Sequence, residues 1–131
     1  MDNTQEQIRA IKECLVEYAG PIYICGKIFD LNADSLTIIH ATMPKEELVI
    51  LNNRYPEWIQ RVKKNATSKN VLLIKDFDKI PYDQQKLFMD IICRNSVSSE
   101  PLPENLKLII NSESRCRLIP EIEQEIQYFE V

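Results

Sequence analysis

The stretch Val71-Leu72-Leu73-Ile74 decides the fold, because all four residues are apolar and no polar residue alternates with them. A short run of this kind is typical of a strand in a parallel sheet that is covered on both faces. Pro81 follows at a position that favours the start of a helix. The segment 82–94 after it carries an apolar stripe formed by Leu87, Phe88, Ile91 and Ile92. The sequence therefore predicts a buried strand that leads into a covering helix.

The same patterns recur on both sides of this stretch. Four more apolar or β-branched runs predict strands at 22–25, 36–41, 106–110 and 126–131. Helical periodicity and proline positions predict helices at 4–19, 45–51, 56–64 and a helical turn at 119–124. A turn is expected at 30–35, and a loop around Pro101 and Pro103. Because strands alternate with helices, we expect an α/β fold with a three-layer, doubly wound, mainly parallel five-stranded sheet, built as one domain over residues 1–131.

Composition narrows the classes of function. The net charge of −4 is unsuited to phosphate backbones, so no direct binding of nucleic acid is expected. The local basic cluster is interpreted as a solvated helix end and loop; it comprises Arg61, Lys63, Lys64 and Lys69. No apolar stretch is long enough for a membrane span and the first residues are polar, so we expect a cytoplasmic protein.

The four cysteines and the single histidine bear on metal binding. No two cysteines are spaced as a CxxC pair, so neither a zinc site nor a disulfide framework is expected. Free thiols in a reducing compartment are expected instead, at Cys14, Cys25, Cys93 and Cys116. His40 has no serine or cysteine motif beside it and is interpreted as a structural residue.

Several of these segments resemble AAA+ ATPases. Residues 71–92, VLLIKDFDKIPYDQQKLFMDII, are similar to the Walker B strand and the helix after it. Residues 101–114, PLPENLKLIINSES, are similar to the next strand, which ends at the sensor-1 residue. Residues 118–131, LIPEIEQEIQYFEV, are similar to the end of the ATPase core, and 36–48, LTIIHATMPKEEL, to a strand of the bacterial enhancer-binding transcription activators. The chain resembles two branches of the family, these activators and the MoxR-like ATPases. The resemblance implies a P-loop NTPase-like core, here without the helical lid.

The residues that would bind and hydrolyse ATP depart from this family. A P-loop, GxxxxGK[ST], uses glycines, a lysine and a hydroxyl to hold phosphates and Mg²⁺. Here Gly26-Lys27 is followed by Ile28, and we interpret it as a turn with an exposed lysine. By the resemblance, Lys75 occupies the Walker B aspartate position and Asp76 the glutamate position, and a lysine there would repel Mg²⁺.

Two further catalytic positions of the family are also altered. Asn111 or Glu113 lies at or near sensor 1, and an asparagine after a strand is interpreted as a turn former. Glu125 falls near the arginine-finger position, where an acidic residue cannot stabilise phosphate charge. Arg115 and Arg117 could act in a neighbouring subunit, although surface arginines beside a loop are the simpler interpretation.

These observations predict a pseudo-ATPase with no catalytic residues, no cofactor and no metal. Gly26, Lys27, Lys75, Asp76 and Asn111 would be vestigial nucleotide-site positions. The expected function is regulation or partner binding in transcription control, including sigma-factor interaction. An AAA+ ATPase, the transcription machinery or further copies of the chain are the expected partners. Two alternatives stay open: a divergent ATP-binding domain of an enhancer-binding-type activator that uses Lys27 and Asp76 and is completed by partner subunits, and a receiver-like signalling domain with Asp76 and Asp78 as its acidic pocket.

Overall fold

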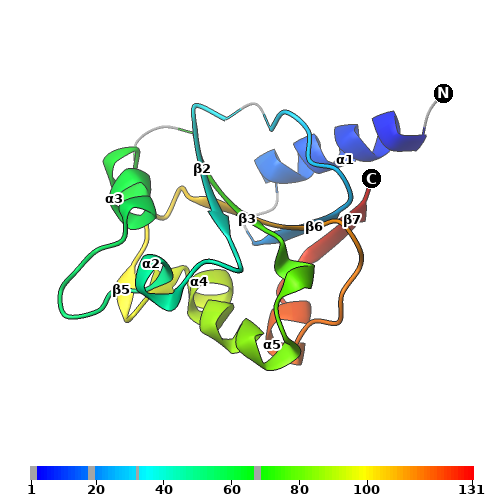
Figure 1. Ribbon diagram of the computed structural model, residues 1–131. Helices are drawn as coiled ribbons and strands as arrows, with labels where there is room; N and C mark the ends of the chain where they lie inside the picture. Colours follow the sequence, from blue (N-terminus) through cyan, green and yellow to red (C-terminus); the bar gives the residue numbers. More distant parts are fainter. Residues whose placement is uncertain (1–2, 18–19, 32, 67–68) are drawn as a thin grey trace.

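A five-stranded, all-parallel sheet forms the centre of the molecule in the computed structural model, which describes residues 3–17, 20–31, 33–66 and 69–131 (Figure 1). The strands lie in the order β2-β3-β6-β1-β7. Their bounds are β1 Ile22–Cys25, β2 Ser35–His40, β3 Asn70–Lys75, β6 Lys107–Ser112 and β7 Gln127–Glu130. The predicted α/β class and the predicted five strands are therefore confirmed, and the sheet is parallel throughout.

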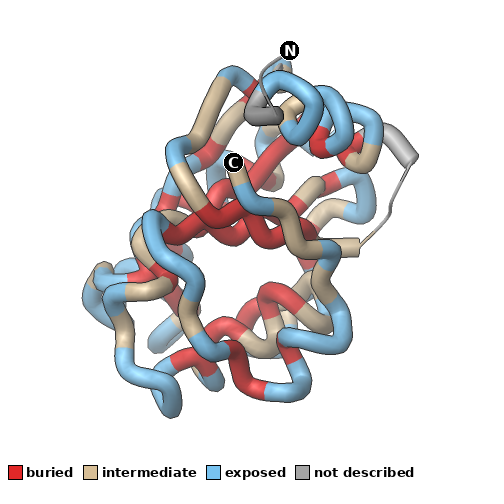
Figure 2. The backbone as a smooth tube through the Cα atoms, turned by 90° about the vertical axis from the view of Figure 1, so that its right-hand side faces the viewer, coloured by how far each residue is buried: buried red, intermediate tan, exposed pale blue. Residues whose placement is uncertain are grey.

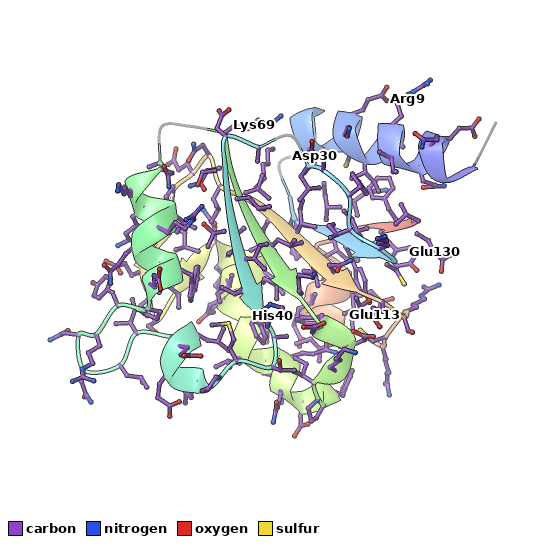
Figure 3. The ribbon with its side chains drawn as sticks, turned by 45° about the horizontal axis from the view of Figure 1, so that its top comes forward. Arg9, Asp30, His40, Lys69, Glu113 and Glu130 are labelled. Atoms are coloured by element: carbon purple, nitrogen blue, oxygen red, sulfur yellow. The ribbon has the colours of Figure 1, made fainter. Side chains whose placement is uncertain are left out.

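The register brings distant parts of the sequence together. Ile22 of β1 pairs with Ile109 of β6 on one side and with Gln127 of β7 on the other. On β3, Leu72 lies beside Thr37 of β2 and Leu108 of β6. Because all strands run in one direction, their carboxyl ends share one edge of the sheet. Figure 3 shows His40 and Glu113 at this edge, while Lys69 lies at the opposite end of the strands.

Helices connect the strands and cover the sheet. The α-helices are α1 Asn3–Glu17, α2 Lys45–Leu48, α3 Glu57–Lys64, α4 Met89–Arg94 and α5 Pro120–Glu123. The 3₁₀ helices are η1 Phe77–Lys79 and η2 Tyr82–Phe88. Proline stands at the starts of four of them. Pro44, Pro56 and Pro81 directly precede their helices, and Pro120 lies in the first turn of α5, where its fixed φ suits the helix and its missing N–H would be unpaired anyway.

Apolar side chains cover both faces of the sheet. On one face, Ile11 and Leu15 of α1 pack with Leu31 against the strands. On the other face, α2, α3, η2, α4 and α5 pack against alternate residues of the same strands, with Trp58 and Phe88 in the centre of this larger cluster. Figure 2 shows the buried residues concentrated along the strands and on the inner sides of the helices. Burial on both faces explains why β1 and β3 lack polar alternation.

Four local expectations need correction. The predicted helix 82–94 begins as the 3₁₀ helix η2 and becomes α-helical only at Met89. The predicted loop around Pro101 contains a small antiparallel hairpin, formed by β4 Ser96–Val97 and β5 Glu100–Pro101. The helix expected at 45–51 ends at Leu48, and an isolated bridge joins Leu51 to Arg54. Strand β6 extends two residues beyond the expected 106–110, so Asn111 lies within it.

Other expectations agree or fall outside the described residues. The helical turn at 119–124 is confirmed as α5. Residues 18–19 of the expected helix 4–19, and residue 32 of the expected turn 30–35, lie outside the described ranges. All four cysteines are free thiols, and Cys25 is buried. Among the helices that the structure describes, none is long and apolar enough to cross a bilayer.

Candidate functional site

Several residues that the sequence singled out lie at the carboxyl ends of the parallel strands. One of them is Gly26, which directly follows β1. Its N–H donates to the Ser112 carbonyl at 2.8 Å, and its φ of +125° is a conformation that residues with a side chain rarely adopt. A Cβ at this position would lie 2.4 Å from the carbonyl oxygen of Val131. The Val131 N–H in turn donates to the Cys25 carbonyl at 2.9 Å. The backbone after β7 therefore lies directly against the turn that follows β1.

The side chain of Asn111 forms hydrogen bonds with the same turn. Its Nδ2 donates to the carbonyl oxygens of Ile24, at 2.9 Å, and Gly26, at 3.0 Å. The side chain is buried within β6, where Asn111 pairs with Ile24. The interpretation of Asn111 as a turn former after the strand is therefore wrong. It is a strand residue whose amide donates to backbone carbonyls of β1 and of the turn after it.

Lys75 and Asp76 lie at the carboxyl end of β3. Lys75 is the last residue of the strand, and Asp76 adopts a left-handed conformation with φ of 61°. Asp76 Oδ2 lies 2.6 Å from Nδ1 of His40, at the end of the neighbouring β2. Both side chains are partly exposed, so this pair adds little to stability. Sequence analysis missed this pair, because only the register of β2 beside β3 brings the two residues together.

The remaining acidic and basic candidates lie close to this edge. Asp78 Oδ2 accepts a hydrogen bond from the Ser114 N–H at 3.3 Å, and Lys79 Nζ lies 3.8 Å from Glu113 Oε2. Both exposed arginines stack on tyrosines, Arg115 on Tyr128 at 4.8 Å and Arg117 on Tyr82 at 4.7 Å from the ring centre. Within the described ranges, no group of three or more His, Cys, Asp or Glu side chains is placed to hold a metal ion.

A buried polar cluster lies under the edge and was not predicted. The Tyr23 hydroxyl is 2.5 Å from Ser112 Oγ and 3.2 Å from Cys116 Sγ, and it accepts a hydrogen bond from the Cys116 N–H. Tyr23 is only 1% exposed, and burial raises the pKa of its hydroxyl well above the ordinary value. Burial likewise raises the pKa of the Cys116 thiol, and it raises that of Tyr128, which packs edge-on against Tyr23, to about 12. These protonated groups connect β1 to the segment after β6.

A groove runs along the outer side of β2, away from this edge. Its volume is about 600 Å³, and its lining includes Ile38 of β2, Trp58 of α3 and three glutamates, Glu46, Glu47 and Glu57. The basic cluster lies close by. Arg61 Nη2 donates to the Leu36 carbonyl at 3.2 Å, and Lys63 forms a 2.7 Å ion pair with Glu100. The glutamates outnumber Arg61 in the lining, so the groove is acidic.

The sequence matches no protein-family model and no curated protein. The similarity of residues 36–48 and 71–131 to AAA+ ATPases is therefore a hypothesis that rests on the residues alone.

Proposed function

We propose that this chain is a non-catalytic, AAA+-like domain that acts by binding a protein partner and does not bind ATP. The observation that carries the proposal is the closed turn after β1. In a P-loop, the corresponding backbone must wrap around phosphate groups and offer them its N–H groups. Here the Gly26 N–H is bonded to Ser112, and the backbone of Val131 lies against Gly26.

The charges at the neighbouring strand ends support the same proposal. Lys75 ends β3 where the family resemblance requires a carboxylate for Mg²⁺, and a lysine there repels the cation. Asn111, at the sensor-1 position of the resemblance, directs its amide into the backbone of β1. Arg115 and Arg117 place their guanidinium groups over tyrosine rings within the same chain. Asp76, Asn111, Arg115 and Arg117 thus each have a partner within the chain.

The kind of partner follows from the resemblance and from the acidic groove. The enhancer-binding activators and MoxR-like ATPases are the branches the sequence resembles, so we propose a regulatory role in transcription, with an AAA+ ATPase, a sigma factor or a further copy of the chain as partner. A cytoplasmic location is part of this proposal, supported by the four free cysteines.

Isothermal titration calorimetry with Mg-ATP tests the proposal. We expect no heat of binding, for the wild-type chain and for the Lys27→Ala and Asp76→Ala variants alike. A dissociation constant in the micromolar range for the wild type would overturn the proposal. If both substitutions also abolished that binding, the competing hypothesis would hold, in which Lys27 and Asp76 belong to a divergent ATP site completed by partner subunits.

A further inference from the structure

Strand β2 forms one edge of the sheet, and its backbone groups alternate in direction. The Ser35 N–H donates to the Lys69 carbonyl at 3.0 Å, and the Ala41 N–H donates to the Lys75 carbonyl at 2.8 Å. In a parallel pair, every second residue of a strand directs both its N–H and its C=O toward the same neighbour. Ser35, Thr37 and Ile39 therefore bond to β3, while Leu36, Ile38 and His40 direct their backbone groups away from the sheet.

Side chains of the same protein occupy both ends of this outer edge. At the amino end, the Leu36 carbonyl accepts a hydrogen bond from Arg61 Nη2 at 3.2 Å. At the carboxyl end, the His40 N–H donates to Met43 Sδ and its carbonyl accepts from the Met43 N–H. Between these two ends, no hydrogen bond from the described residues reaches the N–H or the C=O of Ile38. Ile38 is 48% exposed. The centre of the edge is thus open.

The groove beside this open segment has the chemistry of a peptide site. Trp58 and Pro56 contribute apolar surface to the lining, while Glu46 and Glu47 of α2 and Glu57 of α3 contribute carboxylates. An extended segment places alternate side chains on opposite faces of the sheet. One set can therefore lie in the groove, beside Pro56 and the small exposed part of Trp58, while the backbone pairs with Ile38.

We propose that the open edge of β2 binds an extended, lysine- or arginine-bearing segment of a protein partner as an added strand. The proposal rests on the proposed function as a partner-binding domain and names its docking surface. The N–H and the C=O of Ile38 each form a backbone hydrogen bond with the added strand, whether it runs parallel or antiparallel to β2. Basic side chains of that strand pair with Glu46, Glu47 and Glu57. Strand addition of this kind obtains its affinity from backbone bonds and its specificity from the side chains on either face.

Charge complementarity selects this occupant over a second copy of the chain. Two copies joined at β2 would bring Glu46, Glu47 and Glu57 of one copy beside the same residues of the other. Like charges placed across an interface weaken association. A basic extended segment meets the opposite sign at every one of these positions.

Arg61 controls how much of the edge is available. Its guanidinium is exposed and holds the Leu36 carbonyl, so it must move aside for pairing to extend beyond Ile38. Removal of this side chain frees an acceptor and makes the groove more acidic. Arg61→Ala should therefore bind a basic segment more tightly.

A direct test uses a fluorescein-labelled eight-residue peptide of alternating valine and lysine, with anisotropy as the readout. We expect a dissociation constant below about 1 mM, and a change in Trp58 fluorescence on binding, since Trp58 is the single tryptophan and lines the groove. Glu46→Lys/Glu47→Lys should weaken binding at least about tenfold. The matched control, Glu121→Lys/Glu123→Lys, reverses two first-turn charges on α5, another four-residue helix, and should leave the affinity unchanged.

Changes to the probe test the backbone pairing without altering the protein. Two peptides are compared, one N-methylated at the odd-numbered residues and one at the even-numbered residues. Only one of these two sets of N–H groups faces β2, so one of the two peptides should lose binding and the other should keep it. Equal binding of both N-methylated peptides, equal binding of a valine–glutamate peptide, or no binding at all would overturn the proposal. A dimer in sedimentation that the Glu46→Lys/Glu47→Lys variant strengthens would also overturn it, because a second copy would then be the occupant. Mg-ATP binding in calorimetry is measured separately and would overturn only the proposed loss of nucleotide binding.

Discussion

At the scale of single residues, the backbone at the end of β1 depends on the identity of two residues, Gly26 and Asn111. Gly26 leaves room for the Val131 carbonyl, and Asn111 supplies donors to the carbonyls of Ile24 and Gly26. Both residues occupy positions where the family resemblance suggested nucleotide chemistry. Their contacts give each a structural reason to be present that requires no ligand.

Gly26→Ala should destabilise the protein clearly. The backbone conformation itself costs about 1–3 kcal/mol for a residue with a side chain, and the new Cβ would lie 2.4 Å from the Val131 oxygen, which adds to the loss. Urea unfolding followed by circular dichroism measures the change in the free energy of unfolding.

Ser99→Ala is the control for that experiment. Ser99 is exposed and also has a positive φ, of 69°, but it already carries a Cβ, so its substitution should change the free energy of unfolding by less than about 0.5 kcal/mol. If Gly26→Ala behaved like this control, the close contact between Gly26 and Val131 would be wrong.

At the scale of elements, Tyr23 joins β1 to the segment that follows β6. Its hydroxyl contacts Ser112 and Cys116, and its burial raises the pKa. The folded protein therefore keeps this proton at pH values where the unfolded chain loses it. Because the unfolded state then binds fewer protons, the free energy of unfolding falls as the pH rises above about 10.

Alkaline denaturation should show this link. Between about pH 10 and 12, Tyr23 should contribute a decline in the free energy of unfolding of up to about 1.4 kcal/mol per pH unit. Tyr23→Phe should remove that contribution and flatten the slope. Tyr82→Phe, which removes the hydroxyl of an exposed residue, serves as the control, and an equal slope in wild type and Tyr23→Phe would contradict the link.

The sequence predicted elements better than it predicted their neighbours. The apolar runs at 22–25 and 71–74 identified β1 and β3 because burial on both faces leaves a continuous apolar pattern. The same uniformity carries no information about pairing, so nothing in the sequence placed β1 between β6 and β7. The 3₁₀ conformation of η2 was also missed, since its apolar spacing fits an α-helix as well.

The residues of the candidate site could be singled out from the sequence, but the contacts between them could not. Gly26, Lys75 and Asp76 were singled out by the family resemblance, which compares them with the P-loop and Walker B residues that follow two of the predicted strands. The contact of His40 with Asp76 and the cluster around Tyr23 depend on strand register, which the sequence does not specify. The groove on β2 was not predicted, because it depends on β2 being the edge strand of the sheet. The residue pattern of β2 does not show where the strand lies in the strand order.

At the scale of the whole molecule, the protection of backbone amides should follow the strand order. Strands β3, β6 and β1 each have a neighbour on both sides, whereas β2 has one. Amide exchange in the inner strands should require the largest opening of the structure. Within β2, the Ile39 N–H faces β3 and the Ile38 N–H faces outward.

Hydrogen exchange measured by NMR should therefore resolve these two adjacent residues. The Ile38 amide should exchange much faster than the Ile39 amide in the free protein, and it should slow when the valine–lysine peptide is bound. Comparable protection of both amides in the free protein would contradict the alternation of backbone directions along β2.

The place of β1 in the sheet also affects how the chain is made. Ile22 pairs with Ile109 and Gln127, so the strand of this sheet that is synthesised first is flanked by the two strands of the sheet that are synthesised last. At about 5–20 residues per second, the roughly hundred residues between these partners take seconds to synthesise. Throughout that interval the apolar run Ile22–Cys25 has neither of its native strand neighbours, and unpaired apolar strands of this kind are what chaperones protect from aggregation.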